Sequence, residues 1–223
     1  MTEHGVQAPA VSAPPGPELE VLGAEPARPA AAPTLRFVLN ASEASGREIY
    51  TIALTAQVNI EPARRAYDAE TRERLVELFG DPERWGATAR SLPWARADVQ
   101  VPSFRGTTAF VLDIPCSYDL ELAAAKYFHA LADGEVPLAF HFNGTVLYRG
   151  DEDRLQVVPL PWTSTAQFRL PVATWRAMMD AHYPGGRWIR LDAETLERLA
   201  RRKAERGLTS FDAAVADLLE EAS

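Results

Sequence analysis

The chain has 223 residues, a formal net charge of −8 and a single cysteine. Its length suits one domain, or one domain with an appendage, at roughly 100–200 residues per domain. A hydrophobic fraction of 47% excludes a wholly disordered chain, and the lone cysteine excludes an internal disulfide and a cysteine-rich zinc module. No apolar run approaches the roughly 20 residues that cross a bilayer, and residues 1–17 lack the pattern of a secretory signal, so we expect a cytoplasmic protein.

The N-terminal region is rich in alanine and proline. Proline removes a backbone donor and fixes φ, so neither a helix nor a central strand propagates there. We expect residues 1–17 to form a disordered tail. The alternating segment at 18–22 predicts an edge strand of the domain that follows.

Apolar and polar residues alternate with a period of two over much of residues 18–171. The clearest case runs from Tyr50 to Ile60, and similar patterns occur at 35–39, 110–114 and 138–148, with weaker ones at 95–101, 155–160 and 165–170. This period places one face of each strand on a core and the other in water. The sequence therefore predicts an antiparallel, immunoglobulin-like β-sandwich, mainly β with some α.

Two segments interrupt this pattern. Residues 68–79 predict a crossover helix, because Asp68 suits an N-cap, Leu75 and Phe79 share a face, and Gly80 suits the C-terminal end. Residues 120–131 are ambiguous, since their alanines and apolar spacing favour a helix. Their position before the Asp133–Gly134 turn favours a strand, and we give the strand preference.

After Pro171 the apolar period changes to 3.6, which predicts a C-terminal helical region over 172–223. Val172, Trp175, Met179 and His182 are spaced for a short helix. A short strand is predicted at 187–191, followed by two helices. The apolar residues expected on the buried face of this helical hairpin are Leu196, Leu199, Ala200 and Ala204 in the first helix, and Phe211, Ala214, Val215, Leu218 and Leu219 in the second.

The ends of these two helices carry local signals. Asp192 is expected to cap the first helix, Gly207 to end it, and Thr209 to cap the second. The order of strand, helix, Gly-x-Thr turn and helix over 187–219 resembles a ribbon-helix-helix unit. That resemblance implies a homodimer in which Trp188, Ile189, Arg190 and Leu191 form the shared strand.

The ribbon-helix-helix resemblance also implies DNA binding, but the charge of the segment argues against it. Residues 187–223 carry seven Lys and Arg residues and eight Asp and Glu residues. Affinity for DNA depends on neutralising phosphates, so a nearly neutral segment on an acidic chain offers little. Whether the hairpin dimerises or packs on its own sandwich stays open at this stage.

No motif for catalysis or cofactor binding stands out, and we predict no catalytic, cofactor-binding or metal-binding residue. His129 and His141 flank one turn and could approach each other, but no third ligand is spaced to complete a metal site. Cys116 is expected to be a small buried hydrophobic residue rather than a nucleophile.

Three tryptophans lie in or beside predicted loops: Trp85, Trp94 and Trp162. Tryptophan is enriched at interface hot spots, so these residues are candidate contacts with a partner protein. The alternative role is to plug an open end of the sandwich, which is the more common one.

Four stretches, at 60–65, 79–86, 142–148 and 203–207, resemble a family of bacterial proteins of unknown activity, often encoded near uptake [NiFe]-hydrogenase genes. The resemblance implies a role as an accessory protein in hydrogenase assembly or function, and implies no catalytic residue. Our leading hypothesis is a non-enzymatic, cytoplasmic interaction protein with an unidentified protein partner. The alternatives are a ribbon-helix-helix regulator with a sandwich sensor domain, and an enzyme whose site the sequence does not reveal.

Overall fold

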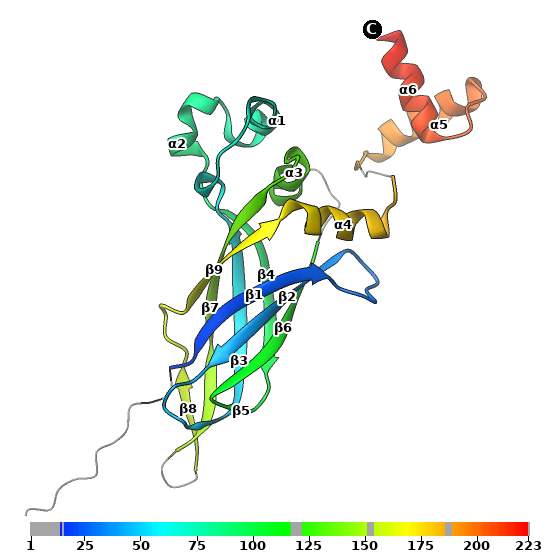
Figure 1. The fold of residues 1–223 in the computed structure, drawn as a ribbon. Helices are drawn as coiled ribbons and strands as arrows, with labels where there is room; N and C mark the ends of the chain where they lie inside the picture. Colours follow the sequence, from blue (N-terminus) through cyan, green and yellow to red (C-terminus); the bar gives the residue numbers. More distant parts are fainter. Residues whose placement is uncertain (1–13, 15, 117–121, 151–153, 186–188, 223) are drawn as a thin grey trace, which may run out of the picture.

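Two antiparallel sheets pack face to face in the computed structural model, which describes residues 14, 16–116, 122–150, 154–185 and 189–222 (Figure 1). One sheet has the strand order β1-β2-β6, and the other has the order β4-β3-β7-β8, with β5 paired to β3 and β9 paired to β7. The strands are β1 (Glu18–Pro26), β2 (Thr34–Ser42), β3 (Glu48–Ile60), β4 (Leu92–Val101), β5 (Phe104–Arg105), β6 (Thr107–Pro115), β7 (Glu135–Arg149), β8 (Leu155–Pro159) and β9 (Thr165–Pro171). This architecture confirms the predicted β-sandwich.

The core lies between the two sheets and follows from the alternation in each strand. In β2 the side chains of Leu35, Phe37 and Leu39 are fully buried, while the residues between them are half-buried. The Phe37 ring packs edge-on against Phe140 of β7 and Phe168 of β9, at centroid distances of 5.3 and 5.9 Å. Burying each large apolar side chain contributes about 1.5–3 kcal/mol, so these contacts hold the two sheets together.

The alternation in β3 departs from the prediction at Tyr50. Its side chain is half exposed to solvent, whereas Ile49 and Thr51 on either side are buried. A register shift between β3 and β7 lies between Ile49 and Thr51, and it turns Tyr50 outward. The buried Thr51 hydroxyl donates to the carbonyl oxygen of Val101 at 2.8 Å, which offsets the cost of placing a polar group in the core.

The close pairing of β3 with β7 depends on Gly144. A Cβ atom at this position would lie 2.4 Å from the carbonyl oxygen of Ala53, well inside van der Waals contact. Only glycine fits such a close backbone approach, so the glycine in this strand is a packing requirement.

The helices α1 (Ala69–Phe79) and α2 (Trp85–Thr88) lie beyond one end of the sandwich, together with the short 3-10 helices η1 (Pro62–Arg64) and η2 (Pro82–Arg84). The predicted helix at 68–79 is confirmed: the Asp68 carboxylate accepts a hydrogen bond from the Thr71 amide at 2.7 Å, and Gly80 follows the helix with a φ of 70°. Helix α2 was not predicted, because its four residues are too few to show a period.

The preference for a strand at 120–131 was wrong. Residues 123–130 form the helix α3 (Ala123–Ala130). The side chains of Arg74 in α1 and Arg176 in α4 donate to the carbonyl oxygens of Ala130 and Leu131 at its C-terminal end. These donors satisfy carbonyls that a helix end leaves free, and they come from distant segments that no local pattern reveals.

The C-terminal region contains α4 (Val172–His182), α5 (Ala193–Glu205) and α6 (Phe211–Glu221). The predicted helix at 172–182 is confirmed, with Trp175 and Met179 buried on the sandwich. Asp192 caps α5 as predicted, by accepting from the Thr195 amide at 2.8 Å. The predicted cap at Thr209 was wrong: Ser210 caps α6, accepting from the Ala213 amide at 3.0 Å.

The predicted strand at 187–191 is not present where the structure can test it. Arg187 and Trp188 lie outside the described residues, and Ile189, Arg190 and Leu191 are not in a strand. A strand needs a hydrogen-bonded neighbour, and none of the described strands pairs with residues 189–191. None of the described helices is long and apolar enough to span a membrane.

Candidate interaction surfaces

Two of the three candidate tryptophans pack against other aromatic rings of the chain. Trp85 lies edge-on to Tyr67 and Phe79, at centroid distances of 5.3 and 5.5 Å, and its indole nitrogen donates to the Gly80 carbonyl oxygen at 2.9 Å. Trp94 packs against Phe128 of α3 at 5.1 Å. Both indoles are half-buried, so they serve mainly to close the end of the sandwich near α1 and α3.

Trp162 differs from the other two because its side chain is 89% exposed. It lies in the turn between β8 and β9. The Ser164 amide donates to the Pro161 carbonyl oxygen at 3.0 Å, and the Phe142 amide donates to the Ser164 carbonyl oxygen at 2.9 Å. Because the turn is bonded both to itself and to β7, it holds the indole in solvent on a fixed backbone.

Strand β8, which leads into this turn, carries further exposed apolar side chains. Leu155 and Val157 are 54% and 66% exposed, and they share one face of the strand because they are two residues apart. They give this edge strand an exposed apolar face. A strand was predicted at 155–160, but no local pattern indicates that these two side chains face solvent.

A pair of tyrosines that the sequence analysis missed joins α3 to the segment before α1. The hydroxyl oxygens of Tyr67 and Tyr127 are 2.7 Å apart, and the Tyr67 hydroxyl donates to the Pro62 carbonyl oxygen at 2.8 Å. Since Tyr67 has one hydroxyl proton, Tyr127 must be the donor between the two. Burial raises the pKa of both phenols, so the pair stays neutral and has a structural role.

The histidines are not brought together into a site. His129 of α3 lies edge-on to Trp175 at a centroid distance of 4.8 Å. His141 is exposed on the outer face of β7, opposite Gln57 and Thr165 in the neighbouring strands. Over the described ranges of the chain, no three His, Cys, Asp or Glu side chains gather in a way that could hold a metal ion.

Cys116 is buried at the end of β6, beside a cavity of about 340 Å³ that Trp94, Phe128 and Trp175 also line. Burial raises the pKa of its thiol to about 12, so the group stays protonated near neutral pH. A neutral thiol is a poor nucleophile, and Cys116 behaves as the small hydrophobic residue expected.

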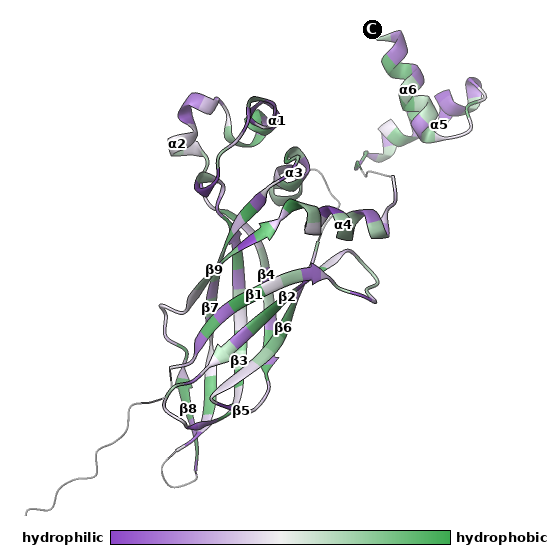
Figure 2. Cartoon of the chain, viewed as in Figure 1, coloured by the Kyte–Doolittle hydropathy of each residue, from purple (hydrophilic) through white to green (hydrophobic). Residues whose placement is uncertain are grey.

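The helical hairpin of α5 and α6 has an exposed apolar face, contrary to the prediction. Only Leu199 and Ala214 are buried, whereas Ala200 and Ala204 are exposed. Of the fourteen exposed large apolar side chains in the described ranges, six belong to this short region: Ile189, Leu196, Phe211, Val215, Leu218 and Leu219. Apolar segments are visible on both helices of the hairpin in Figure 2. The sequence predicted which residues share this face and left open what covers it; within the described ranges, these side chains stay exposed.

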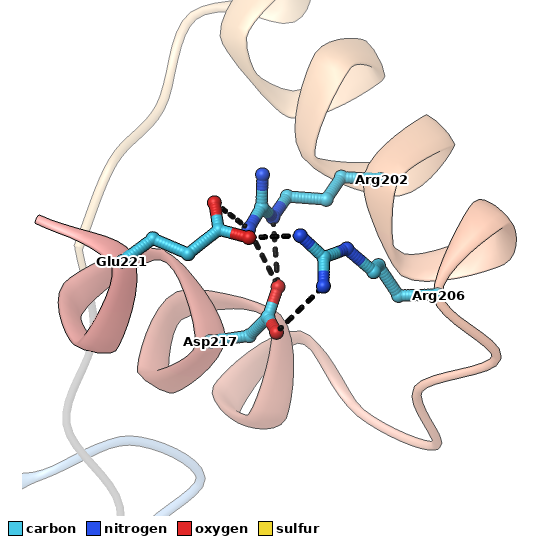
Figure 3. A network of polar contacts seen from close by, with 4 residues as sticks. All are labelled: Arg202, Arg206, Asp217 and Glu221. Atoms are coloured by element: carbon cyan, nitrogen blue, oxygen red, sulfur yellow. Dashed lines mark hydrogen bonds and ion pairs between the residues drawn. The ribbon is translucent and has the colours of Figure 1, made fainter.

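Ion pairs join the two helices of the hairpin (Figure 3). The Arg202 guanidinium donates to Asp217 at 2.7 Å and pairs with Glu221 at 2.6 Å, and Arg206 pairs with the same two carboxylates. The hydrogen bond from Arg202 lowers the pKa of the Glu221 carboxyl. These two arginines would have to leave their partners before contacting a phosphate, which is a second argument against DNA binding. Of the other predicted hairpin residues, Gly207 has the positive φ, 63°, of a helix end.

Comparison with solved structures gives only distant similarities. The chain is similar to the CARDB domain of the PF1109 protein from Pyrococcus furiosus, at 9% identity over 70% of this chain and 92% of that one, with a TM-score of 0.28. It is also similar to part of β-glucosidase 3B from Thermotoga neapolitana, at 13% identity over 70% of this chain and 17% of that one, with a TM-score of 0.26. Scores this low support no inference about function. No curated protein matches the chain.

A family model matches residues 15–223, which is nearly the whole sequence and includes both the sandwich and the hairpin. The chain therefore belongs to DUF6084, a family of unknown function.

Proposed function

We propose that this protein is a non-enzymatic accessory protein that binds a protein partner through the Trp162 turn of its sandwich. The observation that carries the proposal is the 89% exposure of the Trp162 side chain on a hydrogen-bonded turn. Exposing an indole to water is unfavourable, and a rigid backbone lowers the entropy cost of burying it in a partner. The exposed Leu155 and Val157 lie in β8, the strand that leads into this turn, and add apolar area to the same edge of the sandwich.

The resemblance to proteins encoded near uptake [NiFe]-hydrogenase genes suggests the kind of partner. We propose that it is a component of [NiFe]-hydrogenase assembly or function and that binding takes place in the cytoplasm. In this role the sandwich is a rigid support for a contact surface rather than a container for a reaction.

The test is affinity purification of the tagged full-length chain from its native host, grown so that hydrogenase is expressed. We expect a hydrogenase subunit or accessory protein to be enriched with the wild type. Trp162→Ala should reduce its recovery by about tenfold or more, as expected for an interface hot spot worth at least about 1.4 kcal/mol.

Tyr50→Ala is the matched control, because Tyr50 is another exposed aromatic residue on the sandwich. It should leave recovery unchanged, and thermal unfolding should show that both variants fold. Equal recovery with Trp162→Ala and the wild type would refute the proposed contact. Enrichment of proteins unrelated to hydrogenase, lost in Trp162→Ala, would retain the contact and refute the partner.

A further inference from the structure

The apolar face of the hairpin forms a continuous groove. Two adjoining cavities of about 440 and 450 Å³ share the lining residues Ile189, Leu191, Leu199 and Val215. We call this surface the hairpin groove; its apolar lining is completed by Leu196, Phe211 and Leu218. The segment before α5 therefore lies against both helices, and the groove remains open to solvent along them.

The hairpin is too small to be stable with this groove uncovered. Helices α5 and α6 have 13 and 11 residues, and helices shorter than about 12–15 residues are marginal in water. Units below about 40 residues usually need a disulfide, a metal or association to fold. Because only Leu199 and Ala214 are buried, the helices need a further apolar surface against the groove.

Among the residues that the structure describes, the sandwich does not supply that surface. The principal packing partner of α5 is α6, and Figure 1 shows the pair apart from the two sheets. The ion pairs of Arg202 and Arg206 join the two helices to each other and not to the sandwich. A covering surface must then come from another molecule.

The two cavities of the groove carry side chains of opposite charge. Asp212 lines one of the two cavities, while Arg198 lines the other. In a two-fold symmetric pair, each patch faces its own copy, so contacts occur twice. An antiparallel pairing of two grooves would place Asp212 of each chain opposite Arg198 of the other and apolar residues at the centre.

We propose that a second copy of this chain covers the hairpin groove in this antiparallel orientation. A stable dimer buries about 800 Å² on each partner, with an apolar centre and a polar rim. The half-exposed Leu196, Phe211, Val215 and Leu218 supply that centre, and Arg198 and Asp212 supply the rim. The dimer would present two Trp162 turns, which increases avidity for a partner with two sites.

The test is the molar mass of the purified full-length chain, measured by size exclusion with light scattering between about 1 and 100 μM. The wild type should have the mass of two 24.5 kDa chains. Val215→Asp places a charge in the groove and should weaken the dimer on the order of 100-fold or more. Val157→Asp introduces the same charge at an exposed valine of β8 and should leave the dimer intact.

A charge exchange tests the orientation without altering the apolar lining. Asp212→Arg should weaken the dimer at least about threefold, and combining it with Arg198→Asp should restore wild-type affinity. Circular dichroism checks that each variant keeps its helices.

A wild type that has the mass of one chain at 100 μM would overturn the proposal, as would a dimer that Val215→Asp leaves unchanged. Failure of the charge exchange to restore affinity would overturn the antiparallel pairing. These measurements use the purified chain alone, so their failure is distinguishable from a failure of the Trp162 contact.

Discussion

The sandwich and the hairpin follow the same rule of sequence patterning but differ in whether their apolar faces are covered. In the sandwich, the inner faces of two sheets bury each other, and residues such as Phe37 and Phe140 have no exposure. In the hairpin, two short helices carry an equally clear apolar face, yet Leu196 and Phe211 are nearly half exposed. A pattern of apolar residues therefore predicts which face of an element must be buried. It does not predict whether that face packs against the same chain or against another molecule.

The largest effect that would test this comparison concerns the sandwich core. Phe140→Ala removes a fully buried ring that packs against Phe37 and Phe142, and it should lower the free energy of unfolding by about 3–5 kcal/mol. Urea unfolding followed by tryptophan fluorescence measures this change. Leu218→Ala in the hairpin should leave the sandwich transition where it is. An equal loss in both variants would show that sandwich and hairpin unfold as one unit.

A smaller effect is expected from the close approach of β3 and β7. Gly144→Ala would place a methyl group 2.4 Å from the Ala53 carbonyl oxygen, and the resulting overpacking should cost about 1–3 kcal/mol. Gly86→Ala in α2 is the control, because no atom lies within 4 Å of the added methyl group there. Alanine should leave stability unchanged or raise it by up to about 1 kcal/mol at that helical position. A neutral Gly144→Ala would mean that the two strands can separate without loss.

The smallest effect concerns the ion pairs of the hairpin. The pKa of Glu221 is lowered in the folded hairpin by its hydrogen bond from Arg202, so the folded hairpin holds this proton less tightly than the unfolded chain. The stabilisation is present above the unfolded pKa, near 4.5, and is lost as the pH falls through the lower folded value. Amide hydrogen exchange in α6 measures it.

At neutral pH, Glu221→Gln should speed exchange in α6 by no more than a few-fold, since exposed ion pairs contribute little. Glu220→Gln, at the exposed neighbour, should have no such effect. After acidification to pH 2–3, the wild type and Glu221→Gln should exchange alike. A difference that persists at that pH would show that the ion pairs are not its cause.

The agreement between sequence and structure is best where the structure depends on neighbours in the chain. The period-two alternation of β2 and β3 predicted their inner faces, and Asp68 and Asp192 cap their helices as their positions indicated. Tyr50 breaks the pattern because the register with β7 shifts beside it, and the partner strand is far away in the sequence. Helix α3 was missed for a similar reason, since its end is held by arginines from α1 and α4.

In the candidate interaction surfaces, too, the sequence predicted local features but not contacts between distant segments. The sequence located three tryptophans beside turns, but only the packing distinguishes Trp162 from Trp85 and Trp94. The apolar positions of α5 and α6 were correctly identified as one face, and their exposure was not foreseen.

By itself the sequence determined the periodic segments, the caps at Asp68 and Asp192, the helix end at Gly207 and the absence of a familiar catalytic motif, because these depend on residues a few positions apart. The tertiary structure alone decided which apolar faces meet one another, which tryptophan stays in solvent and where the groove of the hairpin opens. Those properties depend on contacts between segments distant in the chain, whose free energies no local pattern encodes.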